Sequence, residues 1–201
     1  MEKNNRFANY GIILKNYLNK IFVLDRKLGK IRCSIKLSRY NSKLINGAYI
    51  SYMLEDTIDI SNSYKISDIK ILNTFNSISN YSYNNLIFFH HVLEISYYFL
   101  PLDHNENIDY IFKLILVLYD SNVQDKLFTK LFLYKFFKAL NIYPEYKYKD
   151  SLRDFTNNFD WKNNLKLNNS LKIWLTLCIS CQPYYNRLKT ITFLKELDIY
   201  E

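Results

Sequence analysis

Cations interspersed with aromatic rings are the residues of this chain most able to do chemistry. The cations near its start are Lys15, Lys20, Arg26, Lys27, Lys30, Arg32, Lys36, Arg39 and Lys43. Three rings lie among them: Tyr17, Phe22 and Tyr40. Cations pair with phosphate oxygens and rings stack on bases, so the combination is typical of a surface that binds single-stranded nucleic acid. Each ring taken alone fits core packing equally well, and each lysine alone fits an ordinary solvated charge.

The distribution of charge along the chain supports a polyanionic partner. Residues 1–43 hold eleven Lys or Arg and two acids, residues 44–120 hold three and nine, and residues 121–201 hold thirteen and eight. The local net charges are therefore +9, −6 and +5, within a total of +8. Abundant Asn, Lys, Ile and Tyr are typical of an AT-rich genome, but that bias raises Lys everywhere and does not reverse a sign. The basic first segment indicates nucleic acid or an anionic membrane.

A second group of lysines follows a helix predicted over residues 123–140. Its members are Lys126, Lys130, Lys135 and Lys138, with Lys147, Lys149 and Arg153 beyond the helix. The apolar spacing predicts an inward face of Leu127, Leu131, Tyr134 and Leu140, and an exposed face of Lys126, Lys130 and Lys138. A groove rimmed by lysines suits an acidic, apolar peptide. An ordinary amphipathic helix explains the same pattern.

Metal, redox and hydrolytic chemistry lack a matching motif. Cys33, Cys178 and Cys181 are too few for a disulfide framework, and the C-x-x-C pair lies in an apolar helical run that favours buried thiols. His90 and His91 are adjacent, so on a helix they point about 100° apart and do not share a site. The chain has no Gly-rich phosphate loop and no nucleophile motif. We therefore expect no metal, no cofactor and no enzyme activity.

The elements that position the first cation group read as strands. Around Gly29, which is free to make a turn, Ile31, Cys33 and Ile35 alternate with Arg32 and Ser34 as in a half-buried strand. The predicted strands are 10–16, 20–25, 30–38, 48–56 and 65–73. Five short strands in about 75 residues fit a small closed barrel of the OB type.

The remainder of the chain reads as helices. Beyond a polar link at 78–84, apolar residues recur every three or four positions. The predicted helices cover 86–100, 105–119, 123–140, 170–181 and 187–197, with a weak one inside 146–169. The most apolar stretch, 86–102, contains His90, His91 and Glu94, which argues against a membrane span. The predicted class is α+β: an OB-like barrel over 1–78 followed by an all-α bundle over 84–201. A start without an apolar leader predicts a reduced cytoplasm.

In this order of elements the chain resembles the RecO family of bacterial DNA repair and recombination proteins. The segments that carry the resemblance span nearly the whole chain: GIILKNYLNKIFVLD, KLGKIRCSIKLSRYNSK, KLFLYKFFKALNIYPEY and RLKTITFLKEL. They look like the opening strand pair of the family, its turn and strand leading to a basic loop, its helix ending before Tyr-Pro, and its tail. Asn141 stands where the family often has Gly, and Thr190 where it often has Ser. Residues 145–177 contain no cysteine, so the zinc site of many members is not expected.

The resemblance implies a non-enzymatic mediator of DNA repair and recombination. Such a protein binds single-stranded and double-stranded DNA, anneals strands, and helps load RecA in place of single-stranded DNA-binding protein, together with RecR. It also implies that the helical part receives the acidic, apolar tail of single-stranded DNA-binding protein, and that the protein acts at the nucleoid. Two alternatives stay open: a helical docking or structural protein whose basic character reflects codon bias, and an RNA-binding OB protein.

Overall fold

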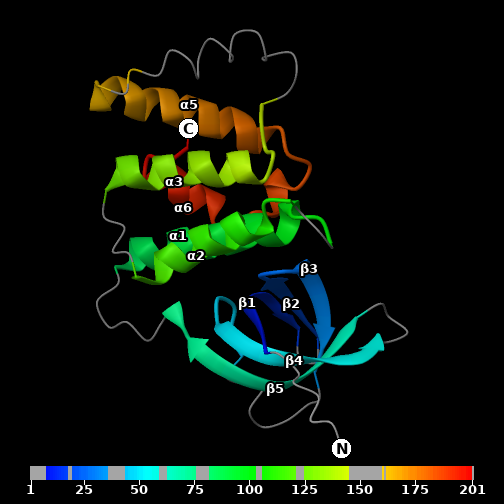
Figure 1. The fold of residues 1–201 in the computed structure, drawn as a ribbon. Coiled ribbons are helices and arrows are strands. Elements are labelled where there is room, and N and C mark those ends of the chain that lie inside the picture. Colours follow the sequence, from blue (N-terminus) through cyan, green and yellow to red (C-terminus); the bar gives the residue numbers. More distant parts are fainter. Residues whose placement is uncertain are drawn as a thin grey trace, which may run out of the picture. The chain divides into compact units, whose positions relative to one another are not determined.

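The first part of the chain folds into a closed five-stranded barrel (Figure 1). The computed structural model describes residues 8–17, 20–35, 44–58, 63–75, 82–102, 106–120, 125–144, 160 and 162–200. The strands are β1 (Asn9–Tyr17), β2 (Lys20–Asp25), β3 (Gly29–Ser34), β4 (Tyr49–Ile58) and β5 (Tyr64–Asn73). They follow one another around the barrel as β1-β2-β3-β5-β4, with β3 and β5 parallel and the other pairs antiparallel. The predicted barrel is confirmed, and this arrangement is consistent with the OB-like type.

Side-chain alternation builds the interior of the barrel. Ile31, Cys33 and Ile35 are buried while Arg32 and Ser34 are half-buried, as the period of two predicted. The interior is completed from the other strands and the loop before β4 by Ile13, Ile21, Val23, Leu44, Ala48, Ile50, Tyr52 and Ile66. Alternation therefore places the residues between these positions on the outer face of the barrel.

The turn between β2 and β3 is held by one buried carboxylate. Asp25 accepts hydrogen bonds from the backbone N–H of Lys27 and of Leu28, both at 2.7 Å, and from the hydroxyl of Tyr52 at 2.5 Å. Gly29 follows with a φ of 83°, a left-handed conformation that glycine adopts without strain. The carboxylate thus orders the exposed turn that carries Arg26 and Lys27.

Helices make up the rest of the described chain (Figure 1). They are α1 (Tyr83–Phe99), α2 (Ile108–Asp120), α3 (Lys126–Ala139), α5 (Asn164–Ser180), the 3-10 turn η4 (Tyr185–Arg187) and α6 (Ile191–Glu196). Each predicted helix outside 146–169 has a counterpart, and α5 begins earlier than predicted because Asn163 caps it by accepting from the N–H of Lys166. None of the helices in the described ranges combines the length and apolar character that crossing a membrane requires.

The chain divides into two compact units, and one division lies between residues 81 and 82, within the predicted link at 78–84. Unit 1 comprises Met1–Tyr81 and Val92–Tyr119, and unit 2 comprises Ser82–His91 and Asp120–Glu201. The second half of α1 and almost all of α2 therefore belong with the barrel. Tyr119, for example, donates its hydroxyl to the carbonyl of Gly47, the residue before β4, at 2.6 Å.

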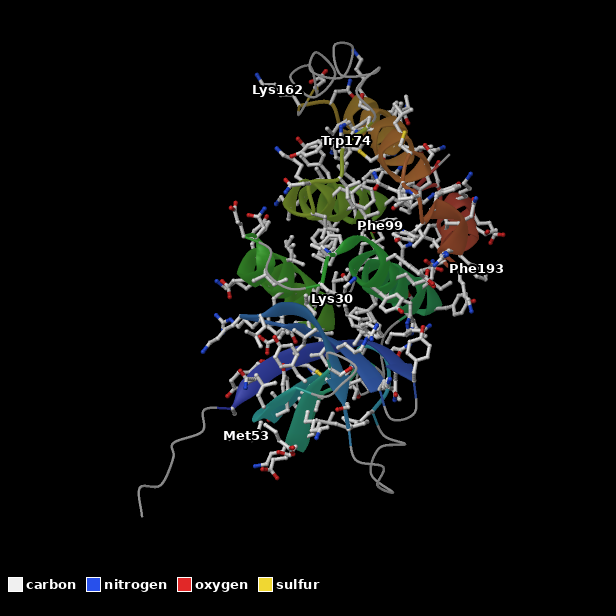
Figure 2. All side chains as sticks on the ribbon, turned by 90° about the vertical axis from the view of Figure 1, so that its right-hand side faces the viewer. Lys30, Met53, Phe99, Lys162, Trp174 and Phe193 are labelled. Atoms are coloured by element: carbon white, nitrogen blue, oxygen red, sulfur yellow. The ribbon has the colours of Figure 1, made fainter. Side chains whose placement is uncertain are left out.

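Unit 2 has its own aromatic core. Trp174 of α5, labelled in Figure 2, contacts the rings of Tyr134 and Phe137 of α3, with centroid distances of 5.0 and 6.4 Å. Phe88 of α1 meets Phe132 of α3 edge-on at 5.6 Å. These contacts fix which side of α3 faces the core, and it matches the predicted side only in part: Tyr134 contacts Trp174 and Leu140 is buried, whereas Leu127 and Leu131 are half-buried.

Candidate nucleic-acid interface

Cross-strand register brings cations and rings of the first group together on the outer face of the barrel. Lys15 of β1, Phe22 of β2 and Arg32 of β3 stand opposite one another, because Lys15 pairs with Phe22 and Phe22 pairs with Arg32. Directly opposed residues point to the same side of a sheet. The next row along the strands is formed in the same way by Tyr17, Lys20, Ser34 and Lys65.

We call these eight residues the basic face: Lys15, Tyr17, Lys20, Phe22, Arg32, Ser34, Lys65 and the helix residue Tyr97, which reaches it as described below. Tyr17 is 48% exposed, and Lys20 and Lys65 are exposed as well. Phe22 and Arg32 are half-buried. The side chains of the second row are therefore more exposed than those of the first. In the second row, the cations Lys20 and Lys65 and the ring of Tyr17 are accessible to solvent.

Phe22 lies at the centre of the ring contacts of the basic face. Its ring meets Tyr17 and Tyr97 edge-on, with centroid distances of 6.2 and 5.1 Å. The guanidinium carbon of Arg32 lies 5.5 Å from the Phe22 centroid, and the Lys15 amine lies 5.9 Å from that of Tyr17. Such cation–ring contacts hold long basic side chains close to the sheet surface. The predicted rings Tyr17 and Phe22 are thus brought among the predicted cations.

Lys30 is a correction to the predicted cation group. It belongs to the adjacent outer row with Ile12 and Leu24, and it is only 8% exposed. Its amine donates to the carbonyl oxygen of Tyr97 at 2.8 Å, and burial lowers its pKa to about 8. Lys30 is therefore not a surface contact for phosphate, because its amine is buried and donates its hydrogen bond to helix α1.

Arg26 and Lys27 are exposed on the β2–β3 turn, as the first cation group requires. Arg26, however, already pairs with Asp109 of α2 at 2.8 Å. Asp109 also pairs with Lys113, and Lys113 and Arg26 together lower the pKa of this carboxyl. One acid therefore sits between two cations at this end of the barrel, and it reduces the charge that Arg26 offers to a ligand.

Four predicted residues of this group lie outside the described residues. They are Lys36, Arg39, Tyr40 and Lys43. Two residues of the basic face were not predicted. Lys65 lies in an acidic part of the sequence, and only the parallel pairing of β5 with β3 brings it to Ser34. Tyr97 lies on a helix assigned to the other predicted domain, so no local signal linked it to the strands.

The lysines of α3 are placed differently from the prediction. Lys126, Lys135 and Lys138 are exposed, whereas Lys130, predicted on the exposed face, is fully buried. The Lys130 amine donates to Asn168 Oδ1 at 2.8 Å and lies 3.6 Å from Asp198 Oδ2. The helix is rotated so that its buried residues include Phe132, Leu133, Phe136 and Phe137, while Leu127, Leu131 and Tyr134 are half-buried. Lys147, Lys149 and Arg153 lie outside the described residues.

Unit 2 has a small pocket beside the start of α3. Its lining consists of Asn84, Phe88, Lys126, Thr129, Leu194, Leu197 and Ile199. The lining is apolar apart from Asn84, Thr129 and the exposed cation Lys126. This chemistry suits an apolar side chain attached to an acidic group, and among the described lysines of the predicted group it is Lys126 that lines the pocket.

The structure also locates the cysteines and the histidines. Cys33 and Cys178 are buried free thiols whose pKa is raised by burial, and Cys181 is half-buried. Within the described ranges there is no group of three or more His, Cys, Asp or Glu side chains able to hold a metal ion. His91 lies in the core with no exposed surface, whereas its neighbour His90 is half-buried.

Comparison with known proteins leaves the family of this chain open. No protein-family model matches it, and no curated protein matches it.

Proposed function

We propose that the basic face binds nucleic acid, and that the protein is a non-enzymatic mediator of DNA repair and recombination. The observation that carries the proposal is the register of Lys15, Phe22 and Arg32, which aligns two cations and a ring across three strands. Strands 2 and 3 of an OB fold are the usual surface for oligonucleotides. Cations that follow a backbone, with rings for bases, bind both DNA forms and depend on salt.

The mediator role is supported by the resemblance to the RecO family. In this proposal the protein binds single-stranded and double-stranded DNA, anneals complementary strands, and acts with RecR to load RecA at DNA damage. It would work at the nucleoid in the bacterial cytoplasm. The barrel followed by helices is the order of parts that such a mediator requires.

The helical unit supplies a candidate site for the tail of single-stranded DNA-binding protein. We place it at the pocket of unit 2, where Phe88, Leu194 and Leu197 offer apolar contact and Lys126 offers a positive charge. The exposed Lys135 and Lys138 would attract an acidic peptide from farther away. Lys130 is excluded from this role because it is buried and bonded to Asn168.

The decisive experiment measures fluorescence anisotropy of a labelled single-stranded 30-mer, about the length of several OB sites, over a salt series. We expect log affinity to fall linearly with log salt, with a slope of about 0.7 per phosphate contact. A variant carrying Lys15→Glu, Lys20→Glu and Arg32→Glu should bind much more weakly and show a slope smaller by about 2.

The matched control reverses three exposed lysines of unit 2: Lys162→Glu, Lys166→Glu and Lys189→Glu. It changes the net charge by the same amount but leaves the basic face intact, so the slope should stay close to that of wild type. If both triple variants lose affinity equally, net charge rather than the basic face governs binding. If wild type does not bind even at low salt, the mediator proposal fails and the chain is better treated as a protein-docking bundle. RNA binding tighter than DNA binding would favour the translation-type OB protein.

A further inference from the structure

We infer that Tyr97, carried by helix α1 and not by the barrel, completes the basic face as a base-stacking residue and makes this face prefer unpaired over paired nucleic acid. The inference rests on the proposed function, because it specifies the ligand of the same site. It goes beyond that proposal because it assigns the preference for unpaired nucleic acid to Tyr97. It also assigns the positioning of Tyr97 to a second residue, Lys30.

Lys30 holds Tyr97 at the face. Tyr97 lies in the last turn of α1, where backbone carbonyls have no partner within the helix. The Lys30 amine donates to the Tyr97 carbonyl at 2.8 Å and lies 5.8 Å from the Tyr97 ring centroid. A cation at the C-terminal end of a helix is also favoured by the helix dipole. Lys30 is therefore a positioning residue that joins β3 to this end of α1 within unit 1 (Figure 2).

The Tyr97 ring is part of a continuous set of rings. It meets Phe22 edge-on, and its hydroxyl lies 3.3 Å from that of Tyr17. Burial, with a smaller effect of Tyr17, raises the pKa of Tyr97 to about 12. The Tyr97 hydroxyl therefore stays neutral at physiological pH and adds no negative charge that would repel phosphates. Phe22 and Tyr97 are both half-buried and Tyr17 is 48% exposed, so Tyr97 extends, beside Tyr17, the ring surface on which bases can stack.

This geometry separates the two forms of nucleic acid. Phosphate contacts are available on single strands and duplexes alike, so Lys15, Lys20 and Arg32 do not discriminate between them. Ring stacking needs an unpaired base whose face is accessible, because in a duplex the base faces cover one another. Removing a stacking ring should therefore weaken binding to single strands and leave binding to duplexes unchanged.

The test compares Tyr97→Leu with wild type on a single strand and a duplex of the same sequence, in DNA and in RNA. Leucine keeps apolar bulk against Phe22 but removes the aromatic ring. We expect single-strand affinity to fall about tenfold, duplex affinity to stay within about twofold, and the salt slope to stay the same. Tyr97→Phe keeps the ring and should retain most of the affinity. Tyr83→Leu, which changes a 67% exposed tyrosine at the opposite end of the same helix, is the matched control and should have no effect.

Lys30→Met tests the positioning role. A lysine that contacts phosphate would lower the salt slope by about 0.7 when removed. A positioning lysine should instead lower single-strand affinity with the slope and the duplex affinity unchanged. A decreased slope would show that Lys30 contacts phosphate, and it would overturn its assignment.

The outcomes distinguish the two proposals. If wild type binds neither form, the proposed function fails and the inference fails with it. If wild type binds and Tyr97→Leu weakens both forms equally, or neither, the proposed function stands and Tyr97 is not a stacking residue. Circular dichroism and thermal unfolding of each variant show whether it is folded. If Tyr97→Leu is not folded, Lys30→Met gives the test: a loss of single-strand affinity with unchanged duplex affinity supports the inference, and an equal effect on both forms, or no effect, contradicts it.

Discussion

The imidazole of His91 lies 2.8 Å from the hydroxyl of Tyr200, which joins helix α1 to the C-terminal segment inside unit 2. Its other ring nitrogen lies 2.7 Å from the hydroxyl of Thr190. His91 has no exposed surface, and burial lowers its pKa to about 3. The histidine is therefore neutral in the folded protein over the whole physiological range.

Acid should destabilise unit 2 through His91. In the unfolded chain the pKa of this histidine is about 6.5, whereas in the folded chain it is about 3. Between these two values the unfolded chain binds a proton at His91 and the folded chain does not. The contribution of neutral His91 to the free energy of unfolding is therefore fully present above pH 6.5. Below pH 6.5 it decreases by about 1.4 kcal/mol for each pH unit. Urea unfolding at pH 7.0, 6.0 and 5.0 measures this loss.

His91→Gln should flatten that pH dependence while lowering stability at pH 7 by about 1–3 kcal/mol, because one buried hydrogen bond is lost. His90→Gln, which changes a half-buried histidine on the same helix, should keep the wild-type profile. Equal slopes for wild type and His91→Gln between pH 6.5 and 5 would show that His91 does not cause the acid sensitivity.

Substitutions at Lys130 and Asp198 should have unequal effects on stability. The Lys130 amine is fully buried, whereas Asp198 is 45% exposed and also pairs with Lys172 at 2.8 Å. Lys130→Met removes the buried charge and leaves no buried charge behind, because Asp198 is 45% exposed and keeps its pair with Lys172, so we expect little loss of stability. Asparagine, like aspartate, tolerates the positive φ of 62° at position 198, so Asp198→Asn does not strain the backbone. It removes the negative charge that faces Lys130, and we expect the free energy of unfolding to fall by about 1–3 kcal/mol.

Chemical denaturation of both variants checks this difference. Lys135→Met, an exposed position on the same helix, controls for the change of residue type and should be within about 0.5 kcal/mol of wild type. A large loss for Lys130→Met together with no loss for Asp198→Asn would contradict the expectation. It would mean that Asn168, not Asp198, supplies the interaction that stabilises the buried amine.

Asp109→Asn should strengthen nucleic-acid binding. Arg26 is 51% exposed and pairs with Asp109, so removing that acid leaves a cation on the β2–β3 turn able to contact phosphate. We expect the salt slope to rise by up to about 0.7. The free energy of unfolding should change little, because exposed ion pairs contribute little to stability.

Asp160→Asn is the control, since it removes one exposed acid in unit 2 and changes the net charge equally. Anisotropy titrations of both variants at several salt concentrations give the comparison. If Asp160→Asn raises the slope as much as Asp109→Asn, the effect comes from total charge and Arg26 has no special part in it.

The spacing of apolar residues along the sequence was sufficient to predict the barrel strands and the helix α2. The alternation through Ile31, Cys33 and Ile35 defined the interior side of β3 and of the residue after it. In α2 the apolar residues that recur every three or four positions, among them Ile108, Ile111 and Ile115, are buried. Local pattern failed at α3, because Phe, Leu and Tyr occur on every side of that helix and the apolar spacing allows two phases. Tertiary contacts from Phe88 and Trp174 select the phase that buries Lys130.

The candidate site was predictable only where it lies within consecutive strands. Lys15, Phe22 and Arg32 are near one another in sequence, and two antiparallel pairings bring them into register. Tyr97 and Lys65 come from a helix and from the last strand, so their place depends on contacts between distant segments. Lys30 shows the reverse case: its position in a basic turn suggested a phosphate contact, while its partner on α1 lies 67 residues away.

Among the described residues, the junction of the barrel with the fewest paired residues is the one between β3 and β5. Within the described residues β3 and β5 are joined at two register pairs, Cys33 with Tyr64 and Ser34 with Lys65, whereas six pairs join β2 to β3. Short junctions are where native proteins open locally, so amide exchange should be fastest there. Lys20 and Lys65 stand on either side of this junction. A ligand that bridges these two lysines would hold the junction shut, so slower amide exchange at Tyr64 and Lys65 would report an occupied basic face.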